Sequence, residues 1–193
     1  AASLGIGMVH QHFMLVEAFT VAENIILGSE VTKNGVLDIK EATKEIKALS
    51  ERYGLAVDPA AKIEDISVGM QQRVEILKTL YRGADILIFD EPTAVLTPSE
   101  IQELVEIMKS LVKEGKSLIL ITHKLDEIRA VADRVTVIRR GKSIETVEIA
   151  GASNQDLAEM MVGRSVSFKT DKVKAQPQET VLSIKDLVVL ENR

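Results

Sequence analysis

The sequence predicts an α/β fold with a mostly parallel main sheet, and two observations favour this class. Short apolar runs that suit strands buried on both faces alternate with segments whose apolar residues recur at helical spacing. One of the apolar runs, Ile86 to Phe89, leads directly into the acidic pair Asp90 and Glu91. Ligands of open parallel sheets bind at the carboxyl ends of the strands, so this pair marks the edge where a site is expected.

The composition fits one domain or slightly more and argues against several kinds of partner. The chain has 193 residues, of which 46% are hydrophobic, enough to build a core. Its formal net charge of −5, without a basic stripe, argues against a nucleic-acid binder. It has no cysteine, which suits a reducing cytoplasm, and its apolar runs are far shorter than the roughly 20 residues of a membrane span. It begins without Met and stops just after a new strand pattern, so we expect a segment of a longer protein.

The first part of the chain predicts one strand and one helix. Ile6 to Gln11 suits a short strand, and the segment after it, up to Gly28, is too apolar for an open loop. We expect this segment to contact a partner and to tolerate a charge at Phe19 or Val21. Asp38 with Glu41 has the capping-box pattern of a helix start. The apolar positions of this helix fall on one face, predicted to be core: Ile39, Ala42, Ile46, Leu49 and Tyr53.

Two further helices are predicted on either side of the acidic strand. Ser67 can cap a helix that runs to about Tyr81. Thr97 is placed to cap the second, with Pro98 at its first position and Glu100 at its third. Its expected buried face consists of Ile101, Leu104, Val105, Met108, Leu111 and Val112.

The remaining elements follow in alternation. Ser117 to Thr122 suits a buried strand, Lys124 to Asp133 a helix, and Arg134 to Arg140 a further strand that turns at Gly141 into another. Ser153 and Asp156 open a last short helix, which ends at Gly163. Residues 164–180 are polar and suit a linker, and Val181 to Leu190 has a new strand pattern.

Several side chains can be interpreted either as part of a functional site or as purely structural. One carboxylate of the acidic pair can hold Mg²⁺ while the other takes a proton from water, or the strand simply runs into an acidic turn. Ser67 can be only a helix cap, and His123 only a histidine at a strand end. Taken singly, the simpler interpretations are favoured. His10 and His12 lack a third metal ligand, and Gly5 to Gly7 opens no helix, so neither predicts a site.

Taken in order, the motifs resemble the ATP-binding cassette of ABC transporters over essentially the whole chain. This resemblance implies an α/β, P-loop NTPase-like cassette core with a helical signature subdomain, incomplete at its N-terminus. The corresponding motifs are the Q-loop glutamine Gln11, the signature Ser67 to Arg73, the Walker B pair Asp90 and Glu91, the D-loop Ala94 to Thr97 and the switch histidine His123.

The resemblance also implies the roles of the residues and the cofactors, ATP and Mg²⁺. Asp90 and Gln11 would bind the Mg²⁺ ion. The catalytic residues would be Glu91, His123 and Gln11. The signature residues Ser67, Gly69 and Gln71 would bind ATP held by an opposing cassette. A helix N-terminus with a close-approach glycine suits such an anion.

Departures from the common pattern narrow the resemblance. The signature has Val68 where glycine is usual and Met70 where glutamine is usual, and the D-loop ends in Thr97 instead of aspartate. These changes resemble the sugar and nucleoside importers whose ATPase subunits carry two cassettes in one chain. The implied division is a partial nucleotide-binding domain over 1–163, with its helical subdomain at about 12–83, a linker over 164–180, and the first strand of a second cassette over 181–193.

The implied function is that of an ATP-binding and ATP-hydrolysing subunit of a sugar or nucleoside importer, attached to the cytoplasmic face of the membrane. Its partners would be transmembrane permease subunits and the opposing cassette, with no nucleic acid. The alternatives are a non-transport ABC ATPase and an inactive module that docks on a permease.

The phosphate loop of such a cassette is not found in this sequence. No stretch matches G-x-x-x-x-G-K-S/T. We therefore expect the isolated chain to bind ATP weakly and to be inactive. In the sheet of the family, the strand that precedes this loop lies between two others: the strand that ends at His123 and the strand Arg134 to Arg140. We expect Val181 to Leu190 to fill that position, by exchange with a second copy in preference to pairing within one chain.

Overall fold

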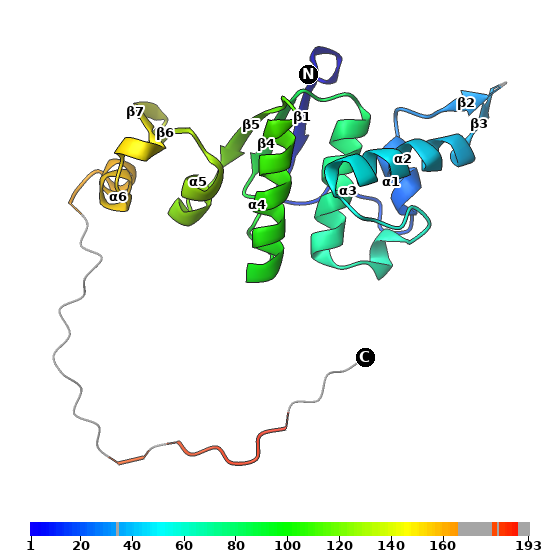
Figure 1. Ribbon diagram of the computed structural model, residues 1–193. Helices are drawn as coiled ribbons and strands as arrows, with labels where there is room; N and C mark the ends of the chain where they lie inside the picture. Colours follow the sequence, from blue (N-terminus) through cyan, green and yellow to red (C-terminus); the bar gives the residue numbers. More distant parts are fainter. Residues whose placement is uncertain (34, 166–178, 181, 189–193) are drawn as a thin grey trace.

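The computed structural model describes residues 1–33, 35–165, 179–180 and 182–188 (Figure 1). A larger unit contains a three-stranded sheet with helices α1 to α4, and a smaller one contains a two-stranded sheet with helices α5 and α6. In Figure 1, α4 crosses the main sheet, α1 to α3 lie beside β1, and the smaller unit lies on the β5 side.

The main sheet is parallel, as the sequence predicts. Its strands are β1 (Ile6–Val9), β4 (Ile86–Asp90) and β5 (Ser117–Ile121), in the order β1-β4-β5. The register pairs Val9 with Phe89 and Asp90 with Ile121, so all three strands end at the same edge. Leu87 and Phe89 are fully buried, which agrees with the prediction of a buried strand before the acidic pair.

The strand that begins at Arg134 does not join the main sheet. β6 (Arg134–Arg139) pairs only with β7 (Lys142–Glu148), in an antiparallel hairpin. The turn between them has positive φ at both Arg140 (50°) and Gly141 (74°), the conformation that matches the twist of a tight hairpin. Within the described residues, β5 and β6 therefore each have one neighbouring strand.

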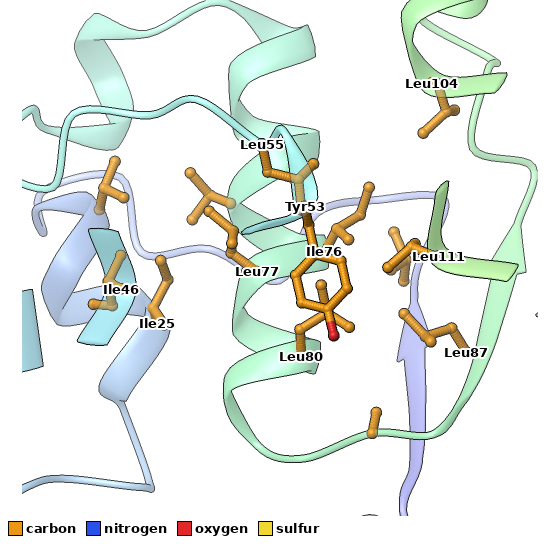
Figure 2. Packing of buried hydrophobic residues seen from close by; sticks show 14 of the residues in the cluster. Ile25, Ile46, Tyr53, Leu55, Ile76, Leu77, Leu80, Leu87, Leu104 and Leu111 are labelled. Atoms are coloured by element: carbon orange, nitrogen blue, oxygen red, sulfur yellow. The ribbon is translucent and has the colours of Figure 1, made fainter. Parts of the chain in front are cut away.

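The larger core forms where three helices pack beside the sheet. These are α1 (Val21–Ile26), α2 (Ile39–Tyr53) and α3 (Val68–Tyr81), with a small hairpin of β2 (Thr32–Lys33) and β3 (Val36–Leu37) between the first two. Figure 2 shows the packing of their apolar side chains against those of β4 and α4. The labelled members of this cluster are Ile25, Ile46, Tyr53, Leu55, Ile76, Leu77, Leu80, Leu87, Leu104 and Leu111.

Two details of this region correct the sequence-based expectations. Val21 is fully buried in the core, whereas Phe19 is 39% exposed, so the expectation that either position tolerates a charge is wrong for Val21. Asp38 caps α2 through the Glu41 N–H at 3.1 Å, but the reciprocal half of the capping box is not formed. The Glu41 carboxylate instead pairs with Lys44 at 3.1 Å.

The helix starts after β4 and β7 match the sequence patterns. α4 (Pro98–Lys113) begins with a complete capping box of Thr97 and Glu100, and α6 (Asn154–Val162) begins with one of Ser153 and Asp156. Between them lies α5 (Leu125–Val131). Short 3₁₀ turns occupy Ala2–Leu4, Ile63–Asp65 and Ile149–Gly151.

The expected strand near the C-terminus is not seen where the structure describes it. Residues 182–188 belong to no strand, and the side chains of Leu182, Ile184, Leu187 and Val188 are 62–75% exposed. Residues 181 and 189–193, and most of the expected linker, lie outside the described residues. Across the described ranges, every helix is too short or too polar to cross a bilayer.

Candidate functional site

The candidate site begins where β4 ends. Asp90 is the last residue of the strand, and Glu91 turns the chain away with φ of 43°. This left-handed conformation costs a non-glycine residue about 1–3 kcal/mol, so neighbouring contacts must hold it. The Glu91 N–H donates to the Ile121 carbonyl at 2.9 Å, and the Ala94 N–H donates to the Glu91 carbonyl at 3.2 Å. We call residues 91–94 the acidic turn.

Glu91 and His123 meet across the ends of β4 and β5. Nδ1 of His123 lies 3.0 Å from Oε1 of Glu91. The His123 side chain is 65% exposed and that of Glu91 is 32% exposed, so the pair lies at the surface. The contact is a hydrogen bond when Nδ1 carries a proton, and it orients the carboxylate. A carboxylate placed in this way can accept a proton from a bound water.

Asp90 and Gln11 lie at the same edge without partners. Within the described part of the chain, the half-buried Asp90 carboxylate and the exposed Gln11 amide form no hydrogen bond or ion pair. The β1–β4 register places Gln11 two residues beyond Val9, level with Glu91 two residues beyond Phe89. An unpartnered carboxylate suits Mg²⁺, which proteins often bind through one or two carboxylates and substrate phosphates.

A resident metal site is not present among the described residues. No group of three or more His, Asp or Glu side chains is arranged there to hold an ion. The residues at the edge therefore fit a metal ion that arrives with a phosphate ligand, and they do not fit a metal held by protein alone.

The signature residues Ser67 and Gly69 lie at the start of α3, apart from the acidic turn. Ser67 caps the helix, and its hydroxyl accepts from the Met70 N–H at 3.3 Å. Gly69 faces Glu100, and a Cβ atom at Gly69 would collide with that carboxylate. Both residues line a hollow of about 210 Å³ between α3 and α4. No hydrogen bond among the described residues joins Ser67 or Gly69 to Asp90, Glu91 or His123.

The carboxylate of Glu100 already offsets the partial positive charge at the N-terminus of α3. Hydrogen bonds from the Thr97 backbone and hydroxyl lower the pKa of Glu100, and the Gly69 backbone N–H acts in the same direction. Gln71 points elsewhere: its amide donates to the carbonyls of Ile63 and Ile66, at 3.3 and 3.4 Å. In this arrangement its side chain supports the loop before α3 and does not face the hollow.

Sequence reasoning missed the residues that hold the acidic turn. Gln72 is 2% exposed, and its amide donates to the Pro92 carbonyl at 2.6 Å. Its spacing from Ile76 and Leu80, both buried, could have placed it on the inner face of α3. A second set consists of Thr93, Thr122, Lys124 and Glu127, joined by hydrogen bonds and an ion pair. We call this set the Glu127 network.

Comparisons with known proteins place the chain in a family. The model of the ABC transporter family matches residues 1–94. Over its whole length the chain is 76% identical to the nucleoside import ATP-binding protein NupA of Lactococcus lactis, and 65% identical to the guanosine import ATP-binding protein NupO of Bacillus subtilis. The chain belongs to the ABC transporter ATP-binding proteins. It spans 38% of the length of each of these two relatives.

Solved ABC structures have the same fold. CbiO1 of Clostridium perfringens, part of an ABC transporter complex, superposes with a TM-score of 0.62 at 27% identity, over 75% of this chain and 57% of that one. An ATP-binding cassette solved as a dimer with ADP and Pi gives the same TM-score at 26% identity, over 76% of this chain and 64% of that one. The predicted α/β ABC cassette fold and the family resemblance are thus confirmed.

Proposed function

We propose that the protein containing this chain is the ATP-hydrolysing subunit of an ABC importer, and that this chain supplies one set of hydrolytic residues. The observation that carries the proposal is the contact of Glu91 with His123 beside the unpartnered Asp90. Nucleosides are the favoured solute class. The two relatives with 76% and 65% identity are named for nucleoside and guanosine import, and one named for glucose import has 44% identity.

The proposed substrate is ATP with Mg²⁺, and the chain's own groups serve the attacking water. Glu91 would accept a proton from this water while the water oxygen attacks the γ-phosphorus and ADP leaves. His123 would hold the Glu91 carboxylate in place and contact the γ-phosphate. Asp90 and Gln11 would hold the metal ion, which neutralises phosphate charge when it is bound.

The signature residues would act on a nucleotide held mainly by an opposing cassette. Ser67 and Gly69 lie at the N-terminus of a 14-residue helix, where backbone N–H groups without a partner inside the helix favour an anion. The approach of a phosphate requires Glu100 to yield its place beside Gly69, since two anions repel. Gln71, predicted to bind ATP directly, would contribute instead by holding the loop at Ile63 to Ile66.

The remaining proposals concern organisation and partners. We assign the partial nucleotide-binding domain to residues 1–163, with the helical subdomain at about 12–83, a linker to 164–180 and the start of a second cassette to 181–193. Permease subunits would contact the apolar segment from Phe13 to Gly28 and the helical region before Ser67, on the cytoplasmic face of the membrane. The exposed side chains of Met14, Val16 and Phe19 support this surface.

The test is the variant Glu91→Gln in the intact protein, with any second hydrolytic site disabled. The amide keeps the shape of the side chain and cannot take a proton, so ATP binding should persist while turnover falls about 100-fold or more. Glu106→Gln is a matched control, because Glu106 is an exposed residue on α4 that forms an ion pair with Lys109 at 3.0 Å. Undiminished turnover in Glu91→Gln would refute the assignment.

A further inference from the structure

We propose that Glu127 is a positioning residue for ATP hydrolysis: its carboxylate fastens the acidic turn to the loop that carries His123, and so keeps Glu91 against His123. The inference rests on the proposed function, because it concerns the same hydrolytic residues. Glu127 itself touches neither Glu91 nor His123 through a hydrogen bond.

The carboxylate of Glu127 joins the two loops with one oxygen each. Oε1 accepts a hydrogen bond from the hydroxyl of Thr93, which lies two residues beyond Glu91. Oε2 accepts one from the hydroxyl of Thr122 at 2.9 Å, directly before His123. Glu127 is 5% exposed and Thr93 is 3% exposed, so these bonds are shielded from water. Their low-dielectric surroundings make them stronger than equivalent bonds at the surface.

Lys124 completes the network and balances its charge. Its Nζ lies 3.3 Å from Oε1 of Glu127 and donates to the hydroxyl and the carbonyl of Thr93, at 2.9 and 3.1 Å. The Lys124 N–H donates in turn to the Thr122 hydroxyl at 3.1 Å. The Thr93 hydroxyl thus accepts from Lys124 and donates to Glu127. A buried carboxylate that has both a cation and two hydroxyl donors has the partners that such a charge requires.

The position of the network explains why the Glu91–His123 contact needs support. The last ladder bond between the two loops is that of the Glu91 N–H to the Ile121 carbonyl at 2.9 Å. Beyond it, the described residues link the loops only through the network and through the Glu91–His123 contact itself. That contact joins an exposed histidine to a partly exposed carboxylate, and pairs near the surface contribute little by themselves. The buried network therefore fixes the spacing.

A purely structural role makes a different prediction. If Glu127 only anchored α5, its loss would lower the stability and leave the kinetic constants of the folded protein unchanged. If it positions Glu91 and His123, its loss would lower kcat and leave the KM for MgATP unchanged. An error of about 1 Å in the placement of a catalytic group can cost about 100-fold in rate.

The experiment uses the intact protein, with any second hydrolytic site disabled, and compares Thr93→Val with Thr93→Ser. Valine has nearly the shape of threonine but lacks the hydroxyl, whereas serine keeps it. We expect Thr93→Val to lower kcat about tenfold or more while KM stays within about twofold, and Thr93→Ser to stay close to the original protein. Glu127→Gln should resemble Thr93→Val, and it replaces that variant if Thr93→Val does not fold.

The effect should also depend on His123. In a His123→Ala background, measured in single turnover, Thr93→Val should lower the rate of hydrolysis little further. The distance between Glu91 and His123 that Thr93 helps to fix no longer matters in that background. An unchanged kcat in folded Thr93→Val and Glu127→Gln, an equal loss in the His123→Ala background, or failure of serine to restore the rate would each overturn the inference. If Glu91→Gln itself leaves turnover unchanged, the proposed function fails. If Glu91→Gln abolishes turnover and the Thr93 and Glu127 variants do not, only the positioning role fails.

Discussion

The side chain of Gln72 donates a hydrogen bond of 2.6 Å to the carbonyl of Pro92, so the helix that begins at the signature residues touches the residue next to Glu91. It is the one hydrogen bond among the described residues that joins α3 to the acidic turn. Both Gln72 and Pro92 are buried, so neither group exchanges freely with water. If a ligand at the N-terminus of α3 displaced this helix, the hydrogen bond would therefore transmit the movement to the acidic turn.

Gln72→Met should destabilise the protein. Methionine keeps the length of the side chain but cannot donate, which leaves the buried Pro92 carbonyl without its partner at a cost of about 1–3 kcal/mol. Urea unfolding of the intact protein measures this loss. Gln71→Met is the control, because Gln71 is partly exposed and its hydrogen bonds are longer, at 3.3 and 3.4 Å. An equal or larger loss in the control would contradict this account.

The proposed permease contact can be separated from the fold with two neighbouring residues. Phe19→Asp should keep the folded structure, because Phe19 is 39% exposed, and should weaken assembly with the permease and transport. Val21→Asp places a charge at a fully buried position and should prevent stable folding. Co-purification with the permease and circular dichroism measure the two effects.

Val112→Asp is the control for the exposed change. The sequence pattern places Val112 on the buried face of α4, but it is 45% exposed. It lies outside the proposed contact, so its variant should assemble and transport normally. If Phe19→Asp assembles as well as Val112→Asp, the permease contact lies elsewhere.

Local patterns predicted the parts of the structure that depend on nearby residues. Thr97 with Glu100 and Ser153 with Asp156 form complete capping boxes, because both partners lie within one turn of helix. Asp90 ends a parallel strand, since a buried apolar run that stops at acid indicates its own boundary. Local patterns did not predict which strands pair with β6, because strand pairing depends on residues that are distant in the sequence.

The groups that hold the site were missed because their partners are far away in the sequence. Thr93 and Glu127 are separated by 34 residues, and Gln72 and Pro92 by 20. A polar residue in a helix is normally expected at the surface, and only the tertiary structure shows that Gln72 and Glu127 point inward. For the same reason, the sequence pattern does not distinguish the buried Val21 from the partly exposed Phe19.

Tyr81 provides a spectroscopic test of the packing of α3 against α2. Burial, together with the hydrogen bond of 2.9 Å to Glu45, raises the pKa of Tyr81 to about 12. The unfolded value is about 10. The folded state thus favours the neutral phenol, and its contribution to stability is complete below about pH 10 and is lost as the pH rises towards about 12. The sequence has two tyrosines and no tryptophan, so Tyr53→Phe leaves Tyr81 as the single tyrosine reporter.

The tyrosinate absorbance of Tyr53→Phe should therefore rise with a midpoint well above that of free tyrosine. Glu45→Gln in the same background should lower this midpoint, because the amide carries no charge that opposes ionisation. A midpoint near that of free tyrosine, while circular dichroism still shows a folded protein, would mean that Tyr81 is not packed in this way.

The last prediction concerns the open edge of β5. Its backbone pairs only with β4 within the described residues, and Ile119 and Ile121 are 51% and 48% exposed. An apolar strand with a free edge is a template for another strand, since each unpaired backbone group gains a partner when two chains meet. Residues 182–188, with exposed Leu182 and Ile184, do not cover this edge within one chain. We therefore expect the 193-residue chain to associate with a second copy as its concentration rises.

Light scattering over a dilution series tests this association. Ile119→Lys should shift the chain towards the monomer, because a lysine beside a strand edge opposes pairing. Val162→Lys is the matched control, since Val162 is 53% exposed on α6 and belongs to no strand, and it should leave the association unchanged. Leu182→Lys distinguishes the two kinds of contact: it weakens the association if 182–188 of one copy pairs with β5 of the other, and has no effect if β5 pairs with β5. A chain that stays monomeric at every concentration would show that the β5 edge is protected by other means.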